Sequence, residues 1–146
     1  MAYVKLICTS PVTGGDTAIV NAVTTIRGQG IEGDRYCSQD TEPSRQITLI
    51  ECEVIDQFNQ ETRSEIPYAM FRRNLVIEGI HLNNLIGKIF YVGEVKLRGH
   101  ELCEPCLYLQ KTLKVADLVK HLTHKGGLCC EILTSGIIRS GDKLRI

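Results

Sequence analysis

The sequence predicts a mainly β protein, folded as a closed or nearly closed barrel with a few short helices. Short apolar stretches rich in β-branched residues alternate with glycine-containing turns along its 146 residues, and few stretches show the period of a helix. This pattern is typical of barrels, and it differs from the regular alternation of strands and helices in a doubly wound sheet. The length suits one domain with a sizeable core, so we expect a single domain over residues 1–146.

Glycine turns delimit most of the expected strands. A Gly14-Gly15-Asp16 turn follows the first strand, Gly79 ends the fourth, and Gly93-Glu94 connects the fifth tightly to the sixth. Three glycines within residues 28–34 predict a loop. The expected strands, in chain order, are 2–9, 17–27, 45–50, 71–78, 88–92, 95–102, 128–133 and 143–146.

Apolar residues at helical spacing predict two helices. The first covers residues 51–59, with Val54, Ile55 and Phe58 on one face. The second covers residues 115–123, has an acidic residue in its first turn and ends at a pair of glycines. Its pattern consists of Val115, Leu118, Val119 and Leu122, with Asp117 near the start and Gly126-Gly127 after the end.

Composition and charge exclude several classes of function. The chain carries 17 basic and 17 acidic side chains, which argues against binding to duplex DNA or to an anionic membrane but leaves room for a small anionic ligand. No apolar run is long enough to span a bilayer, and the N-terminus lacks the pattern of a signal peptide. Seven cysteines, an odd number, favour free thiols in a reducing compartment. We therefore expect a cytoplasmic protein with no nucleic-acid or membrane partner.

The segment Cys103-Glu104-Pro105-Cys106 follows the strand expected at 95–102. Thiolates are strong metal ligands and nucleophiles, and the proline stiffens the backbone beside one of them. A structural zinc site would need further ligands, and the adjacent pair Cys129-Cys130 fits the usual zinc spacing poorly. A thioredoxin-like dithiol would need the pair to open a helix. Two interpretations remain open: buried packing cysteines, or a single thiolate ligand or sulfur acceptor at Cys106 with Cys103 beside it.

Two other segments could bind an anion. Gly30 and Gly33 can turn backbone amides toward a ligand, and Arg35 offers a planar fork for phosphate. Taken alone, this segment is better explained as a turn with a surface Asp-Arg pair. In the strand expected at 71–78, Arg72 and Asn74 would share one face and Arg73 would point to the other. An Arg and an Asn on one face can bind a phosphate and a heterocycle edge, although an exposed basic strand start explains them equally well. Surface positions are expected for His81, His121 and His124.

Taken in order, these segments resemble the MOSC domain, named for the C-terminal part of molybdenum cofactor sulfurase. The resemblance covers nearly the whole chain from about the second strand. It rests on Gly-Ile-Glu-Gly-Asp-Arg-Tyr at 30–36, Arg-Gln-Ile-Thr-Leu-Ile at 45–50, Phe-Arg-Arg-Asn-Leu-Val-Ile-Glu-Gly at 71–79, Leu-Ile-Gly at 85–87, Val-Gly at 92–93, Cys-Glu-Pro-Cys at 103–106 and Gly-Ile-Ile-Arg-Ser-Gly-Asp at 136–142.

The resemblance implies a MOSC-type, pyruvate-kinase-barrel-like β-barrel with a site for the molybdenum cofactor (molybdopterin). In relatives that hold this cofactor, such as the mitochondrial amidoxime-reducing component, a cysteine thiolate ligates molybdenum, and Cys106 is at the matching position. Arg72 and Asn74 match residues of the cofactor-facing strand. The glycine-rich segment adds three candidate cofactor-binding residues: Gly33, Asp34 and Arg35.

Relatives with established reductase or sulfurase activity carry additional domains, which this sequence does not show. We therefore expect a separate protein to donate electrons or sulfur, and no pyridoxal phosphate. The favoured hypothesis is a molybdenum-cofactor-binding domain, which could serve as a module of a reductase for N-hydroxylated compounds. In a second hypothesis the protein carries sulfur as a persulfide on Cys106, which Cys103 resolves. In a third it is a non-catalytic cofactor carrier.

Overall fold

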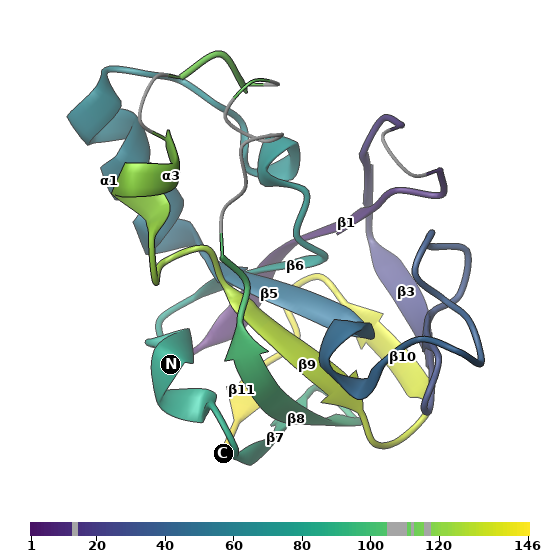
Figure 1. Ribbon diagram of the computed structural model, residues 1–146. Coiled ribbons are helices and arrows are strands. Elements are labelled where there is room, and N and C mark those ends of the chain that lie inside the picture. Colours follow the sequence, from purple (N-terminus) through teal and green to yellow (C-terminus); the bar gives the residue numbers. More distant parts are fainter. Residues whose placement is uncertain (13–14, 105–110, 112, 116–117) are drawn as a thin grey trace.

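The computed structural model describes residues 1–12, 15–104, 111, 113–115 and 118–146 (Figure 1). It is mainly β, as the sequence predicts, with an eight-stranded sheet in the order β11-β7-β8-β9-β5-β6-β1-β2 and a three-stranded sheet in the order β10-β3-β4. The strands are β1 (Tyr3–Thr9), β2 (Ala18–Val20), β3 (Ala22–Ile26), β4 (Gly30–Ile31), β5 (Ile47–Glu51), β6 (Leu75–Glu78), β7 (Ile89–Val92), β8 (Val95–Leu102), β9 (Leu128–Ile132), β10 (Gly136–Arg139) and β11 (Leu144–Arg145).

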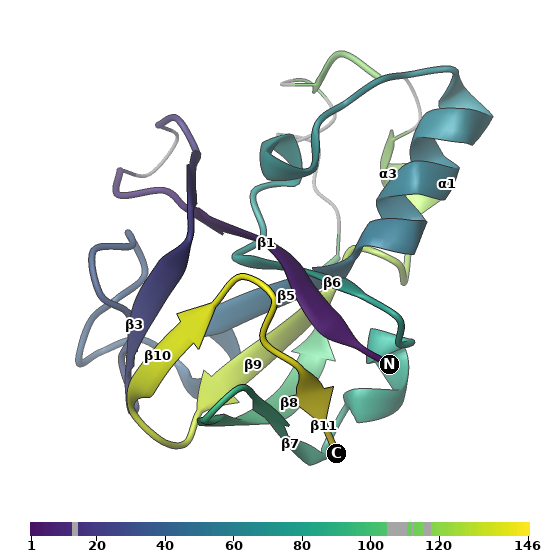
Figure 2. The same ribbon diagram turned by 180° about the vertical axis from the view of Figure 1, so that it is seen from behind.

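The large sheet curls until β1 meets the segment that leads into β11. Tyr3 forms a bridge with Lys143, Val4 donates its N–H to the carbonyl of Asp142, and Leu144 donates its N–H to the carbonyl of Ala2. Both views show the start of β1 beside β11 (Figures 1 and 2). Because β11 is the first strand of the sheet order and β1 the seventh, these bonds close the sheet into a barrel.

Two apolar clusters stabilise the fold. The barrel interior is filled by inward-facing residues of the strands, among them Val4, Leu49, Leu75, Phe90 and Leu97. The second cluster lies where the helices α1 (Cys52–Thr62) and α3 (Leu118–Leu122) cover the outside of β5 and β6 (Figure 1). It includes Ile50, Ile55, Phe58, Val76 and Leu118. Strands β5 and β6 are therefore buried on both faces.

Most predicted elements are confirmed, and β8 has the predicted bounds. The strand predicted over 17–27 is wrong as a single element, because the chain bends at Asn21. Strand β2, before the bend, pairs with β1, and β3, after it, pairs with β10 of the small sheet. Strands β4 and β10 lie where no strand was predicted. Of the helix predicted over 115–123, residues 116 and 117 lie outside the described residues, and the remainder contains α3.

The strand predicted over 71–78 begins only at Leu75. A 3-10 helix, Tyr68–Phe71, occupies the preceding residues, and Arg72 ends it in a left-handed conformation with φ of 63°. Since Arg72 and Arg73 precede the strand, the alternation of strand side chains does not govern where they point. Among the described residues, no helix is long and apolar enough to cross a membrane.

Candidate functional site

A cavity of about 430 Å³ lies on the outer face of β5, β8 and β9. The alternation of strand side chains explains its position, since Leu128 and Cys130 of β9 point into the barrel while Cys129 points away from it. The cavity is lined by Arg35, Tyr36, Arg45, Thr48, Arg72, Arg73, Asn74, Glu101, Leu102, Cys103, Glu104 and Cys129. Four arginines and two glutamates leave an excess of two positive charges, so the cavity favours an anionic ligand.

Arg35 reaches the cavity from the loop after β4. Its guanidinium lies 4.3 Å from the centre of the Tyr36 ring, and its Nη1 is 3.7 Å from Oδ1 of Asp34. Asp34 is turned toward the protein, because its Oδ1 accepts the N–H of Ser10 at 2.9 Å. Gly33 has a φ of +84°, which the turn requires. Of the three predicted residues of this loop, Arg35 therefore lines the cavity, whereas Gly33 and Asp34 shape the backbone that presents it.

Arg72 and Arg73 both line the cavity, so the prediction that they face opposite ways is wrong. Arg72 donates to the carbonyl of Gly15 at 2.7 Å and to Oγ of Ser10 at 3.0 Å, and so holds the loop after β1. Arg73 donates from Nε to the carbonyl of Gly126 at 2.8 Å and from Nη2 to the carbonyl of Cys103 at 3.5 Å. Hydrogen bonds to backbone carbonyls fix the direction of each guanidinium.

Asn74, a predicted cofactor-binding residue, lines the cavity, and its side chain also ties three strands together. Its Oδ1 accepts hydrogen bonds from N and Oγ1 of Thr48 at 3.0 and 3.2 Å, and its Nδ2 donates to the carbonyl of Cys8 at 3.3 Å. The side chain is buried at the junction of β1, β5 and β6. Its first role is therefore to hold the wall of the cavity.

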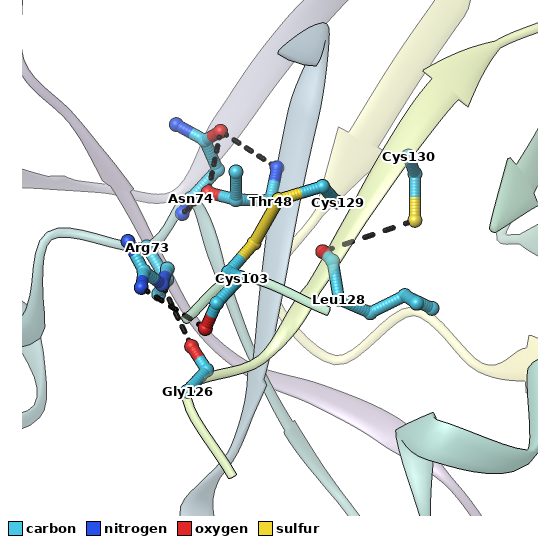
Figure 3. Close-up of a disulfide and its surroundings, with 8 residues drawn as sticks. All are labelled: Thr48, Arg73, Asn74, Cys103, Gly126, Leu128, Cys129 and Cys130. Atoms are coloured by element: carbon cyan, nitrogen blue, oxygen red, sulfur yellow. Dashed lines mark hydrogen bonds between the residues drawn. A yellow bond between two sulfur atoms is a disulfide. The ribbon is translucent and has the colours of Figure 1, made fainter. Parts of the chain in front are cut away.

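Cys103 and Cys129 form a disulfide in the cavity wall, with their Cα atoms 5.5 Å apart (Figure 3). The expectation of free thiols is wrong for these two cysteines and confirmed for Cys8, Cys37, Cys52 and Cys130. The figure shows Cys130 pointing away from the disulfide, with its Sγ 3.9 Å from the carbonyl of Leu128. Cys106, the predicted molybdenum ligand, lies outside the described residues, so its role stays a prediction.

The histidines pair with glutamates. His81 lies 3.4 Å from Glu51, His100 2.9 Å from Glu131, His121 3.6 Å from Glu61 and His124 3.5 Å from Glu104. The predicted surface positions of His81 and His124 are confirmed, and His121 is half-exposed. Within the described part of the chain, no three His, Cys, Asp or Glu residues gather as a metal site would require.

We expect three of the free thiols to resist alkylation in the native protein at pH 8. Burial raises the pKa of Cys8 to about 11, and burial together with a hydrogen bond to Glu53 raises that of Cys52 to about 12. Burial also raises the pKa of Cys130. Since the thiolate is the reactive form, brief treatment with iodoacetamide followed by peptide mapping should find these three unmodified. Denatured protein, in which all three should react, is the control, and rapid native labelling of Cys52 would contradict this account.

A model of the MOSC domain family matches residues 12–145 of the chain. The crystal structure of the YuaD protein from Bacillus subtilis superimposes with a TM-score of 0.84 at 18% identity, covering 98% of this chain and 93% of that one. YiiM from Geobacillus stearothermophilus gives 0.79 at 16% identity, covering 99% and 74%. YiiM from Escherichia coli gives 0.75 at 20% identity, covering 99% and 69%. At these identities the structural likeness concerns the fold alone, and a search of curated proteins found no match.

Proposed function

Because the chain belongs to the MOSC domain family, a family associated with the molybdenum cofactor, we propose that its arginine-lined cavity binds this cofactor. The observation that carries the proposal is the convergence of four arginines on one cavity. They come from three separate segments: the loop after β4, the 3-10 helix Pro43–Arg45 and the turn before β6. Guanidinium groups bind phosphate through paired, charge-assisted hydrogen bonds, and the cofactor carries a phosphate.

The residues of the cavity suit the cofactor in charge, size and shape. The excess of positive charge suits a phosphate, and the volume lies in the range of small-molecule sites. Tyr36, stacked by Arg35 on one side, offers an aromatic surface at which a planar heterocycle can pack. Arg35 and Arg73 would hold the phosphate, while Arg72 and Asn74 would keep the surrounding loops in place.

Cys106 would supply the thiolate ligand to molybdenum. Thiolates are soft ligands suited to such metals, and the chain from Cys103, which lines the cavity, to Cys106 spans about 10 Å at most. When bound, the cofactor would supply an electron-transferring metal centre, and the residues of the chain would bind and orient it. A separate electron-donor protein would complete a reductase for N-hydroxylated compounds.

A persulfide carrier is the second candidate. The observation that favours it is the Cys103–Cys129 disulfide, because Cys103, three residues before Cys106 in the sequence, already forms a sulfur–sulfur bond. In this role Cys106 would accept sulfur from a donor protein, and reduced Cys103 would resolve the persulfide by exchange. A mass increase of one sulfur atom on Cys106 after incubation with a desulfurase would support it.

The test is to purify the protein from a host that makes the cofactor and to measure molybdenum and pterin per protein. We expect near-stoichiometric amounts of both in the wild type and little molybdenum in Cys106→Ser, because a serine hydroxyl is a poor substitute for a thiolate. Cys37→Ser, which changes a partly exposed free thiol, is the matched control and should load like the wild type. Wild-type protein without pterin or metal would refute the proposal, whereas equal loading of Cys106→Ser would refute only the ligand assignment.

A further inference from the structure

The Cys103–Cys129 disulfide lies in the wall of the same cavity that the arginines line (Figure 3). Cys103 is buried at the end of β8, and Cys129 is half-buried in β9. Nη2 of Arg73 reaches the carbonyl of Cys103, which places a fixed positive charge next to the disulfide. Four other described cysteines are free thiols, so the pair is not part of a disulfide framework. In a reducing compartment, a disulfide of this kind is usually transient and either catalytic or redox-sensing.

The charge balance of the cavity depends on the state of these two sulfurs. Among the described residues, the ionisable groups that line the cavity with these sulfurs are Arg35, Arg45, Arg72, Arg73, Glu101, Glu104 and Tyr36. His124 pairs with Glu104. With the disulfide intact, the arginines exceed the glutamates by two charges. Two thiolates in the same wall would cancel that excess. The oxidised cavity therefore attracts an anion more strongly than the reduced cavity with ionised thiols.

We propose that the Cys103–Cys129 disulfide is a redox switch that sets the anion affinity of the cavity. The proposal rests on the proposed function, since it concerns the same anion site. A small thiol is the reductant: its thiolate attacks Sγ of Cys129, the more exposed of the two cysteines, forming a mixed disulfide and releasing Cys103 as a thiolate. The thiolate of a second small thiol then attacks the small-thiol sulfur of the mixed disulfide. The two small thiols leave joined as a symmetrical disulfide, and Cys129 is released as a thiolate. Two electrons pass from the two small thiols to the protein.

The arginines favour this reaction in two ways. They attract an anionic attacking thiolate into the cavity, and they stabilise the thiolates that leave, since nearby cations lower a thiol pKa. Cys130 takes no part although it adjoins Cys129, because its side chain lies in the barrel interior on the other face of β9. The adjacent cysteines thus have separate roles: one packs in the core and the other faces the cavity.

The experiment measures pyrophosphate binding by calorimetry at pH 8.5 to Cys106→Ser protein, which lacks the thiol three residues after Cys103 in the sequence. Peptide mapping first verifies the Cys103–Cys129 disulfide in the oxidised sample and its loss in the reduced one. We expect reduction to weaken pyrophosphate binding about tenfold, because the thiolates add screened negative charge beside the bound anion. In the Cys103→Ser/Cys129→Ser variant, binding should be insensitive to reductant and close to that of the oxidised protein.

The outcomes separate the switch from the site. Equal affinity in both redox states would overturn the switch and leave the anion site standing. No binding in either state would overturn the site proposed for the cofactor phosphate and the switch with it. A redox effect that persists in the Cys103→Ser/Cys129→Ser variant, or the absence of the disulfide from oxidised protein, would also overturn the switch.

Discussion

Gly127→Ala is expected to lower the free energy of unfolding by at least about 3 kcal/mol. Gly127 has a φ of +114°, and a Cβ at this position would overlap the carbonyl oxygen of Leu49 and contact Cα of Ile50 at 3.5 Å. Both neighbours are backbone atoms of β5. Because β5 is buried on both faces, its backbone cannot move away from the added Cβ without disturbing the packing of both apolar clusters. Urea unfolding followed by circular dichroism measures the loss.

The same substitution should disturb the cavity. The carbonyl of Gly127 accepts the N–H of Cys103 at 2.8 Å, and the carbonyl of Gly126 accepts Nε of Arg73 at 2.8 Å. A displaced turn would therefore move the disulfide and one of the four arginines together. Gly141→Ala is the matched control, because Gly141 has a φ of +93° but no atom within 4 Å of an added Cβ. It should cost about 1 kcal/mol, and equal losses in the two variants would show that the overlap with β5 is unimportant.

Asn74→Ala is expected to destabilise the protein by about 3 kcal/mol. The truncation leaves the part-buried N–H of Thr48 and the buried carbonyl of Cys8 without their side-chain partner. Both groups lose the benefit of a hydrogen bond, and the carbonyl of Cys8 also stays shielded from water. The loss is measured by urea unfolding, and pyrophosphate binding should weaken as well because the cavity wall is no longer held.

A double-mutant cycle with Thr48→Val separates the contributions. Valine removes the hydroxyl that contacts both Oδ1 and the backbone N of Asn74, but it keeps the backbone N–H that donates to Oδ1. We expect Thr48→Val to be milder than Asn74→Ala and the double variant to lose less than the sum of the two, since the residues share one hydrogen bond. Strict additivity would contradict the network described for these strands.

The sequence predicted the barrel well because turns and strand alternation are local signals. Strand β8 was obtained to the residue, since a tight Gly93-Glu94 turn starts it and the Cys103 segment ends it. The strand at 17–27 was predicted as one element because the bend at Asn21 is marked by a single asparagine, a weaker turn signal than glycine or proline. Strand β10 was missed because its pairing with β3 joins segments more than a hundred residues apart.

The site was predicted in part, for a similar reason. Arg35, Arg72 and Asn74 stood out because they lie in short motifs, and all three line the cavity. Arg73 was assigned to the opposite face because nothing in the sequence reveals that Arg72 ends a 3-10 helix. Arg45 and Cys129 were missed as site residues. Their contribution depends on how the 3-10 helix Pro43–Arg45 and β9 pack against β8, which only the tertiary structure shows.

The seam between residues 2–4 and 142–144 has a consequence for folding kinetics. These bonds join segments near the two ends of the sequence. Most of the chain entropy that is lost when distant segments come together must therefore be lost before the seam can form. Proteins dominated by such distant contacts fold on the millisecond-to-second timescale rather than in microseconds. The barrel therefore closes late, and until then β1 and β11 each keep an unpaired edge that is open to pairing with another chain.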